Sequence, residues 1–200
     1  MKLGRYEGLP TVRWLEDGRR VQLSEPFCYI QSNGTEWRVP EEAIVDGASI
    51  PQVLWTVMKG PFEGLYRNAS IIHDWHCDLR TRPWKSVHRV FYEAMLTSGV
   101  SELRARLMYG GVYWGGPRWS ETAGHNVRLA ARQPDKRVFK TRFDIEGMPI
   151  DEDSAFIQKA SFSSTKFAFT ESNLRQLEEK INSDNPGLRG VERFVDSMTQ

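Results

Sequence analysis

Residues 65–98 read LYRNASIIHDWHCDLRTRPWKSVHRVFYEAMLTS, and this stretch decides the fold. Over 65–79, apolar side chains return at helical spacing, which predicts one amphipathic helix. Over 83–98, the same pattern predicts a second helix, with a proline in its first turn and Gly99 as a stop. Because only a short loop joins the two segments, we expect the helices to pack as a pair.

Polar side chains interrupt the apolar faces of both predicted helices. His73 and His76 fall inside the apolar arc of the first helix, with Cys77 at its edge and Asp74 on its flank. His88 falls inside the arc of the second helix. A buried imidazole needs hydrogen-bond partners, so either the backbone satisfies these histidines or they form a metal or acid–base site. Zinc-type ions favour such ligands, although the spacing matches no established metal motif.

The segment Val45-Asp-Gly-Ala-Ser-Ile-Pro51 comes before the helical pair. Asp46 and Ser49 are small polar residues, and Gly47 permits backbone angles that other residues avoid. One interpretation is that Asp46 or Ser49 caps a short helix expected at 52–59. The other is that Asp46 supplies a carboxylate to the histidines.

The rest of the pattern indicates an α+β fold. Two turn signals, Glu16-Asp-Gly18 and Ser32-Asn-Gly34, lie between alternating segments and predict the hairpins of an N-terminal antiparallel β-meander. Three or four α-helices are expected to pack on this meander. The strands are expected at 11–15, 19–23, 26–31 and 36–39, and the remaining helices at 102–114, 171–182 and 188–198.

Charge divides the chain into two expected units. A unit at 1–119 carries the Asp/His motifs, and a polar, basic linker follows at 120–136. A small C-terminal α/β extension at 137–200 is expected to contain one strand, at 137–145, and two helices. We expect the first unit to be the more tightly integrated of the two.

Composition excludes several classes of protein. Hydrophobic residues make up 40% and charged residues 26% of the chain, as in soluble globular proteins. The formal net charge of +1 gives no general attraction to nucleic acid, and no apolar run is long enough to span a membrane. Without a signal peptide or a disulfide spacing, we expect cytoplasmic synthesis and reduced thiols. Export by a specialised route or incorporation into a virion stays open.

Four short motifs occur in a fixed order along the chain. They are Asp46-x-Ala-Ser-Ile-Pro51, His73-Asp74-x-x-Cys77, Phe91-x-x-Ala-Met95 and Gly116-Pro-x-Trp119. Over about residues 10–119, this set resembles a bacterial and phage family of unknown function, domain-of-unknown-function family thirteen-fifty-three. The resemblance implies membership and brings no established activity. The family usually has aspartate where this chain has His88. Both residue types can bind a metal or pair with another titrating group, so the exchange keeps either role possible at this position.

These residues predict a hydrolase with an Asp/His site, acting with or without a divalent metal such as zinc or manganese. The catalytic residues are expected to be Asp46, His73, Asp74 and His88, which should converge in space. The metal ligands would be His73, His88 and Asp46, and substrate binding is assigned to Ser49, Arg67 and Cys77. By association with the family, the substrate would be a cell-envelope component, and the partners would be phage or secretion-system components. Peptide, ester and phosphodiester bonds all stay open.

Two alternatives stand beside this hypothesis. The first is a non-enzymatic phage or mobile-element accessory protein, in which a buried Asp/His network locks the helices onto the sheet. The second is a hydrolase of another type. Cys77 would be its nucleophile beside His73 or His88, or His73-Asp74 would act like the His-Asp pair of secreted phospholipases A2, where the histidine is the base and the aspartate binds calcium.

Overall fold

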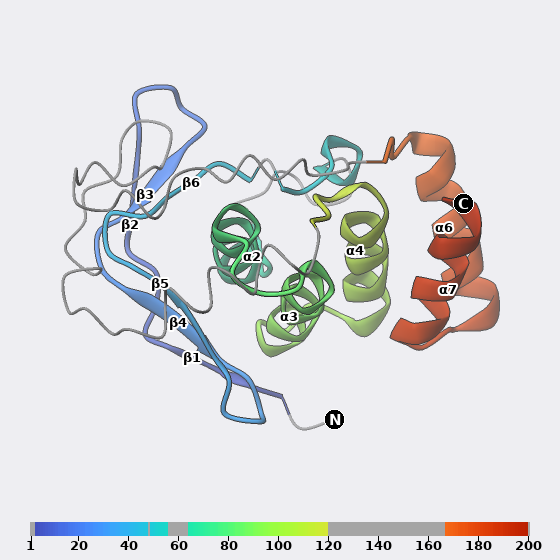
Figure 1. Ribbon diagram of the computed structural model, residues 1–200, viewed down its shortest axis with the longest axis horizontal. Helices are drawn as coiled ribbons and strands as arrows, with labels where there is room; N and C mark the ends of the chain where they lie inside the picture. The colour runs from blue at the N-terminus through green and yellow to red at the C-terminus, as the bar shows by residue number, and fades with distance from the viewer. Residues whose placement is uncertain (1–2, 48, 56–63, 120–166, 200) are drawn as a thin grey trace.

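The computed structural model describes residues 3–47, 49–55, 64–119 and 167–199. Within them the chain forms two three-stranded antiparallel sheets and a stack of helices, which confirms the α+β class. In Figure 1 the strands lie at one side of the molecule and the helices follow in layers away from them. Every helix of this described part is too short or too polar to cross a membrane.

The strands pair in two separate sheets rather than in one meander. One sheet has the order β1 (Arg5–Glu7), β4 (Phe27–Ile30) and β5 (Glu36–Val39), and the other has the order β2 (Val12–Trp14), β3 (Val21–Leu23) and β6 (Ile44–Val45). Both expected hairpins, β2–β3 and β4–β5, are present. However, β3 already has β2 on one edge and β6 on the other. A strand has only two edges, so β4 pairs instead with β1, which the sequence pattern did not predict.

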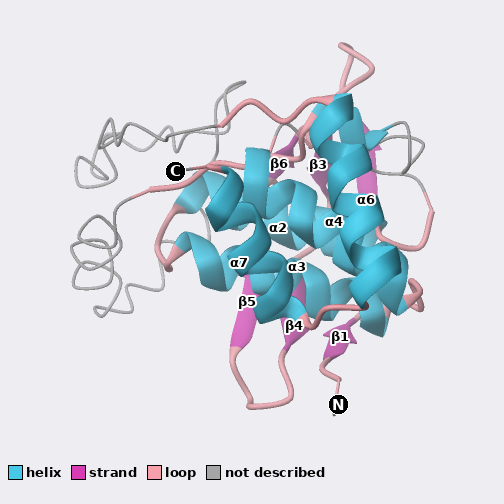
Figure 2. Ribbon diagram, turned by 90° about the vertical axis from the view of Figure 1, so that its right-hand side faces the viewer, coloured by secondary structure: helices cyan, strands magenta, loops and turns pink. Residues whose placement is uncertain are grey.

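Five of the expected helical segments are helical in the described residues. Helices α2 (Arg67–Leu79) and α3 (Trp84–Thr97) form the predicted pair, and α4 (Glu102–Gly115) packs beside α3. Helices α6 (Glu171–Asp184) and α7 (Leu188–Met198) form the outer layer, which Figure 2 views face on. The short helix expected at 52–59 begins with a 3₁₀ turn, η1 (Gln52–Leu54), followed by Trp55 in α-helical conformation, and its residues 56–59 lie outside the described part. The expected strand at 137–145 and the linker at 120–136 lie outside the described residues.

The outer helices pack closely on α4 through a glycine. A Cβ atom placed on Gly110 would lie 2.7 Å from Cδ2 of Leu177 on α6 and 3.1 Å from Cγ1 of Val191 on α7. Both of these side chains are fully buried. The absence of a side chain at Gly110 therefore lets α6 and α7 approach the backbone of α4.

A buried carboxylate ties α7 to the inner helices as well. Glu192 accepts hydrogen bonds from Nε and Nη2 of Arg89 on α3, each at 2.9 Å, and from the hydroxyl of Tyr109 on α4. The C-terminal helices thus share the core of the motif-bearing helices. That the chain before residue 119 folds as a unit of its own stays a prediction.

Replacing Gly110 by leucine tests this integration. The added side chain should push α6 and α7 away from α4, and such overpacking costs about 1–3 kcal/mol, which lowers the melting temperature by several degrees. Thermal unfolding followed by circular dichroism measures the shift. Leu103→Ala is the control on the same helix, because Leu103 is 51% exposed. A Gly110→Leu protein that melts like the wild type would show that the outer helices fold apart from α4.

Candidate functional site

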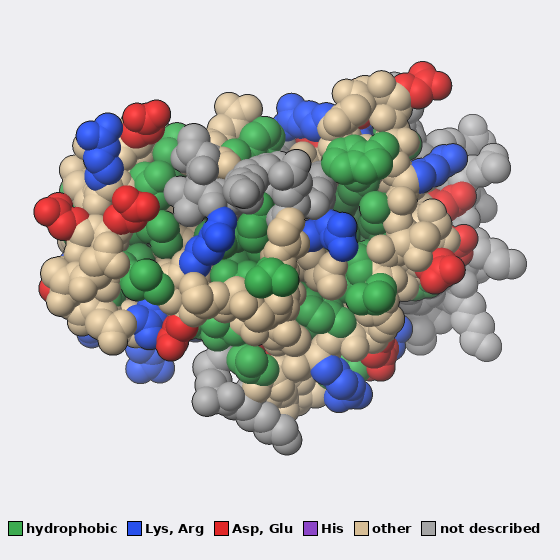
Figure 3. Space-filling model, turned by 180° about the vertical axis from the view of Figure 1, so that it is seen from behind, with side chains coloured by type: hydrophobic (Ala, Val, Ile, Leu, Met, Phe, Trp, Pro, Cys, Tyr) green, Lys and Arg blue, Asp and Glu red, His purple; other side chains and the backbone are tan. Residues whose placement is uncertain are grey.

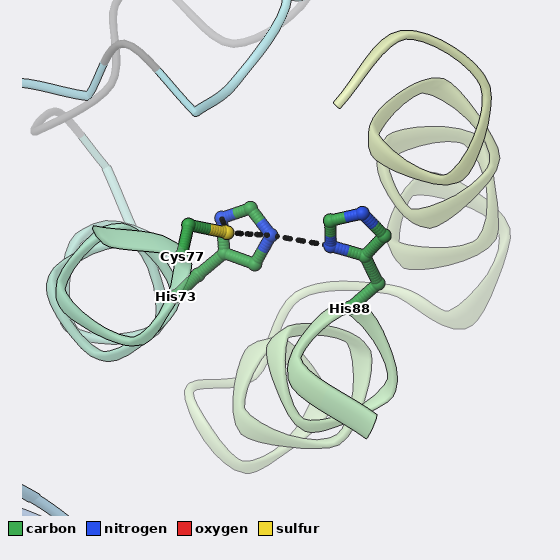
Figure 4. Close-up of side chains that lie close together, drawn as sticks. All are labelled: His73, Cys77 and His88. Atoms are coloured by element: carbon green, nitrogen blue, oxygen red, sulfur yellow. Dashed lines mark hydrogen bonds between the residues drawn. The ribbon is translucent and has the colours of Figure 1, made fainter. Parts of the chain in front are cut away.

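Two histidines and a cysteine meet between α2 and α3. His73 and Cys77 lie one turn apart on α2, and their side chains point towards His88 on α3 (Figure 4). The Nε2 atom of His73 is 2.9 Å from Nδ1 of His88. The Sγ atom of Cys77 is 3.5 Å from the same Nε2 atom. We call these three residues the His73–Cys77–His88 cluster.

The cluster is closed off from solvent. His73 and His88 are 0% exposed and Cys77 is 1% exposed, and Figure 3 shows no described histidine on the face it presents. Burial lowers the pKa of His73 to about 3 and the pKa of His88 well below its ordinary value, and it raises the pKa of the Cys77 thiol well above its ordinary value. At neutral pH both imidazoles are therefore uncharged, and one ring N–H donates to the other ring.

The segment after α4 covers His88. A Cβ atom on Gly116 would lie 3.2 Å from both Nε2 and Cε1 of His88, so the glycine lets the backbone approach the imidazole. The Trp84 ring meets the same imidazole edge-on at 5.4 Å. Nε2 of His88 has no hydrogen-bond partner of good geometry within the described residues, although the backbone of Pro117 is close enough to raise its pKa. From sequence, Gly116 was identified only as part of the Gly116-Pro-x-Trp119 motif.

Two of the three ligand distances within the cluster are close to those of a tetrahedral metal centre. One ligand atom from each of the three residues lies within 4.8 Å of the others. Typical zinc bond lengths place a nitrogen and a sulfur ligand about 3.6 Å apart and two nitrogens about 3.3 Å apart. The N···S distance of 3.5 Å between His73 and Cys77 matches this. The N···N distance of 2.9 Å between His73 and His88 requires the imidazoles to separate by only about 0.4 Å.

Asp74 is held in a second, neighbouring cluster. Its side chain is turned about 100° from His73 around α2 and is almost fully buried. The backbone N–H groups of Asp46 and Gly47 donate to its Oδ2 atom at 2.9 and 3.0 Å, and the N–H of Ser49 donates to its Oδ1 atom at 3.2 Å. Burial, followed by the charge of Asp46, raises the pKa of the Asp74 carboxyl, and the three donors act against that rise. Asp74 therefore anchors the 46–49 loop.

The other predicted site residues are spread around these two clusters. The Asp46 carboxylate lies 3.8 Å from Nη2 of Arg19 and is 34% exposed, so it does not complete the expected four-residue convergence. Ser49 is buried, and its side chain lies close enough to the Cys77 thiol to lower the pKa of that thiol, against the larger rise caused by burial. Arg67 is exposed at the start of α2, about 9 Å along the helix axis from His73. The catalytic and substrate-binding roles of all these residues stay predictions.

His76 is directed away from the cluster although it shares the apolar arc of α2. Its ring meets Trp37 of β5 edge-on at 5.0 Å, so it faces the sheet. Burial, with the charge of Arg82, lowers its pKa to about 3. Both ring nitrogens lack a partner of good geometry within the described residues. We interpret His76 as a neutral packing residue between α2 and the sheet.

A cavity of about 410 Å³ lies beside the anchored loop. Its wall is formed mainly by residues of the 50–55 segment, with Arg19, Gly115 and Phe169. Ile50 in this wall follows Ser49, which contacts Cys77, and Gly115 precedes Gly116, which packs against His88. Two residues of the cavity wall are therefore chain neighbours of residues that lie beside the His73–Cys77–His88 cluster.

Comparison with known proteins confirms the family resemblance expected from the motifs. Residues 21–112 match the family described as "Protein of unknown function (DUF1353)". Two proteins of Sinorhizobium fredii are each 44% identical to this chain: uncharacterized protein y4iH over 103 residues and uncharacterized protein y4jT over 119 residues. These matches cover 52% and 58% of this chain but only 43% and 35% of the two relatives, so the chain spans less than half of either. No solved structure matches.

Buried neutral histidines make stability depend on pH. The pKa of His73 in the folded protein, about 3, lies below the ordinary value of 6.5, so the unfolded state binds more protons between these values. The free energy of unfolding should therefore fall as the pH drops below about 6.5, by up to about 1.4 kcal/mol per pH unit for each such histidine.

His73→Gln removes one of these titrating groups and keeps a hydrogen-bonding side chain towards His88. Urea unfolding between about pH 6 and pH 4, in chelator, should show a shallower pH slope for the variant than for the wild type. Equal slopes would mean that His73 is not buried as a neutral group.

Asp74→Asn tests the loop anchor. The amide nitrogen cannot accept the N–H groups that the lost oxygen accepted, so the free energy of unfolding should fall by about 1.5–3 kcal/mol. Glu179→Gln, on an exposed position of α6, should change it by less than about 0.5 kcal/mol. Similar losses for the two variants in urea unfolding would contradict the anchoring role.

Proposed function

We propose that this protein is a metal-dependent hydrolase whose zinc-type ion is bound by His73, Cys77 and His88. The observation that carries the proposal is the meeting of two imidazole nitrogens and one thiol, all buried and within 4.8 Å of one another, with His73 at 2.9 Å from His88 and 3.5 Å from Cys77. Relative to the expectation from sequence, Cys77 takes the ligand position that we had assigned to Asp46. Manganese is less suitable for such a set, because it prefers oxygen ligands.

The number of ligands favours a catalytic over a structural metal. Structural zinc sites use four protein ligands, whereas catalytic sites use three and keep one position for water or substrate. The described residues offer three. A zinc-type ion in this position lowers the pKa of bound water and polarises a carbonyl or phosphoryl oxygen. Without a metal, burial raises the pKa of the Cys77 thiol, so the thiol keeps its proton. A bound metal ion would favour the thiolate instead.

The cavity of about 410 Å³ is where a substrate would bind. Its wall residues Ile50 and Gly115 are chain neighbours of Ser49 and Gly116, which lie beside Cys77 and His88, and the substrate would reach the metal when this wall moves. The roles follow from this arrangement: His73, Cys77 and His88 hold the metal, and Asp74 and Ser49 position the loop between metal and cavity. A cell-envelope substrate and phage or secretion-system partners stay predictions that rest on the resemblance alone.

The non-enzymatic alternative also has an observation in its favour. Two neutral imidazoles at 2.9 Å satisfy each other by one N–H···N hydrogen bond without any metal. In that case the cluster would lock α2 to α3 as a structural network. The two other hydrolase types are less well supported. Burial raises the pKa of Cys77, which disfavours a nucleophilic thiolate, and Asp74 directs both carboxylate oxygens to the loop backbone rather than to a calcium ion.

Cobalt substitution of the purified protein tests the metal centre. Cobalt bound at the cluster should give a thiolate-to-cobalt charge-transfer band in the near ultraviolet, because Cys77 is a ligand. Cys77→Ala should lose the band and most of the bound metal. Cys28→Ala, which removes the other buried cysteine, on β4, should keep both.

Hydrolysis of 4-nitrophenyl acetate and bis(4-nitrophenyl) phosphate is the matching activity assay. Turnover of at least one of them should fall in chelator, return with zinc and be absent in Cys77→Ala. A protein that purifies without metal, takes up no cobalt and stays folded in chelator would favour the accessory protein over the hydrolase.

A further inference from the structure

The cavity beside the anchored loop combines an apolar wall with few polar groups. Ile50 and Phe169 are buried, and Pro51 and Val53 are partly buried. Ligand sites in proteins have this composition, and a volume of about 410 Å³ lies within their usual range. An apolar group seated here would be removed from water on several sides.

A cation stands at the rim of this cavity. The guanidinium of Arg19 lies 3.8 Å from the Asp46 carboxylate, which is too long for a direct hydrogen bond. The Arg19 side chain is 54% exposed, so its donors remain accessible. A guanidinium presents paired N–H groups that match carboxylate, phosphate and sulfonate oxygens.

A second donor lies in the wall itself. The indole Nε1 of Trp55 is buried and has no hydrogen-bond partner within the described residues. An unsatisfied buried N–H is costly, and the indole nitrogen can only donate. Because Nε1 is closed to a water-sized probe, a ligand oxygen in the cavity would meet it, and remove that cost, only after the Trp55 ring shifts.

We infer that this cavity binds a small amphipathic anion, with its apolar body against Ile50, Val53 and Phe169 and its anionic group at Arg19 and Trp55. This inference deepens the proposed function by naming the class of substrate, and it rests on that function only for the chemistry that would follow binding. Asp46 is the carboxylate that faces Arg19, and the ligand's anionic group would compete with it.

The probe for this site is 8-anilinonaphthalene-1-sulfonate, and N-phenyl-1-naphthylamine is the matched compound without the sulfonate. Isothermal titration should show one saturable site that prefers the sulfonate. Arg19→Gln should weaken the sulfonate about two- to fivefold, as expected for a half-exposed charge, and leave the uncharged amine unchanged. Trp55→Phe, which keeps an aromatic ring and removes the N–H donor, should act in the same direction.

Arg20→Gln is the matched control, because Arg20 lies next in the chain and pairs with Asp17 instead. It should bind both probes as the wild type does. Equal affinity for the two probes, wild-type affinity in Arg19→Gln, or no saturable site would overturn the inference. Cobalt binding separates this inference from the proposed metal centre. Arg19→Gln should bind cobalt as the wild type does. A wild-type protein that binds the sulfonate probe but takes up no cobalt would contradict the hydrolase and leave the anion site standing.

Discussion

The hydrogen bond between the neutral imidazoles of His73 and His88 sets the distance between α2 and α3, and the rest of the site is arranged around it. Neither ring nitrogen in this contact reaches solvent, so each needs the other nitrogen, or a metal ion, to satisfy its hydrogen-bonding or ligand capacity. Cys77 follows one turn after His73 and is therefore brought to the same point. Gly116 then covers His88 closely enough that any side chain would collide with its surroundings. The site is thus assembled from rigid helices rather than from loops, which favours a fixed ligand geometry.

Asp74 extends this arrangement from the helices to the loop at 46–49. Its carboxylate accepts three backbone N–H groups, from Asp46, Gly47 and Ser49, so this segment is held by its main chain. Ser49 contacts the Cys77 thiol, and Ile50 after it forms part of the cavity wall. Asp74 and Ser49 therefore connect the helices to the chain segment that leads into the wall of a cavity of ligand size. This connection is the reason for assigning the two clusters to one function rather than to separate structural tasks.

Sequence reasoning found the elements whose signals are local. Helical periodicity located α2 and α3, and Gly18 and Gly34, both at positive φ, marked the two hairpins. It did not find β1 or the two-sheet arrangement, because strands of two or three residues carry no pattern and their pairing depends on distant segments. Within the site, the spacing of His73 and Cys77 on one helix was sufficient to bring them together. The direction of the Asp46 side chain was not predictable, because a loop residue has no helical or strand periodicity. Periodicity also placed His76 with His73 on one arc of α2, although the His76 ring faces Trp37 of the sheet.

X-ray absorption spectroscopy at the zinc edge, on the protein loaded with one equivalent of zinc, tests the central claim most directly. Zinc bound at the cluster should have one sulfur ligand at about 2.3 Å together with imidazole nitrogens at about 2.0–2.1 Å. This signature arises only if Cys77, His73 and His88 exchange their mutual hydrogen bonds for metal bonds. A first shell of oxygen and nitrogen alone, without sulfur, would contradict it and would leave the buried imidazole pair as a purely structural contact.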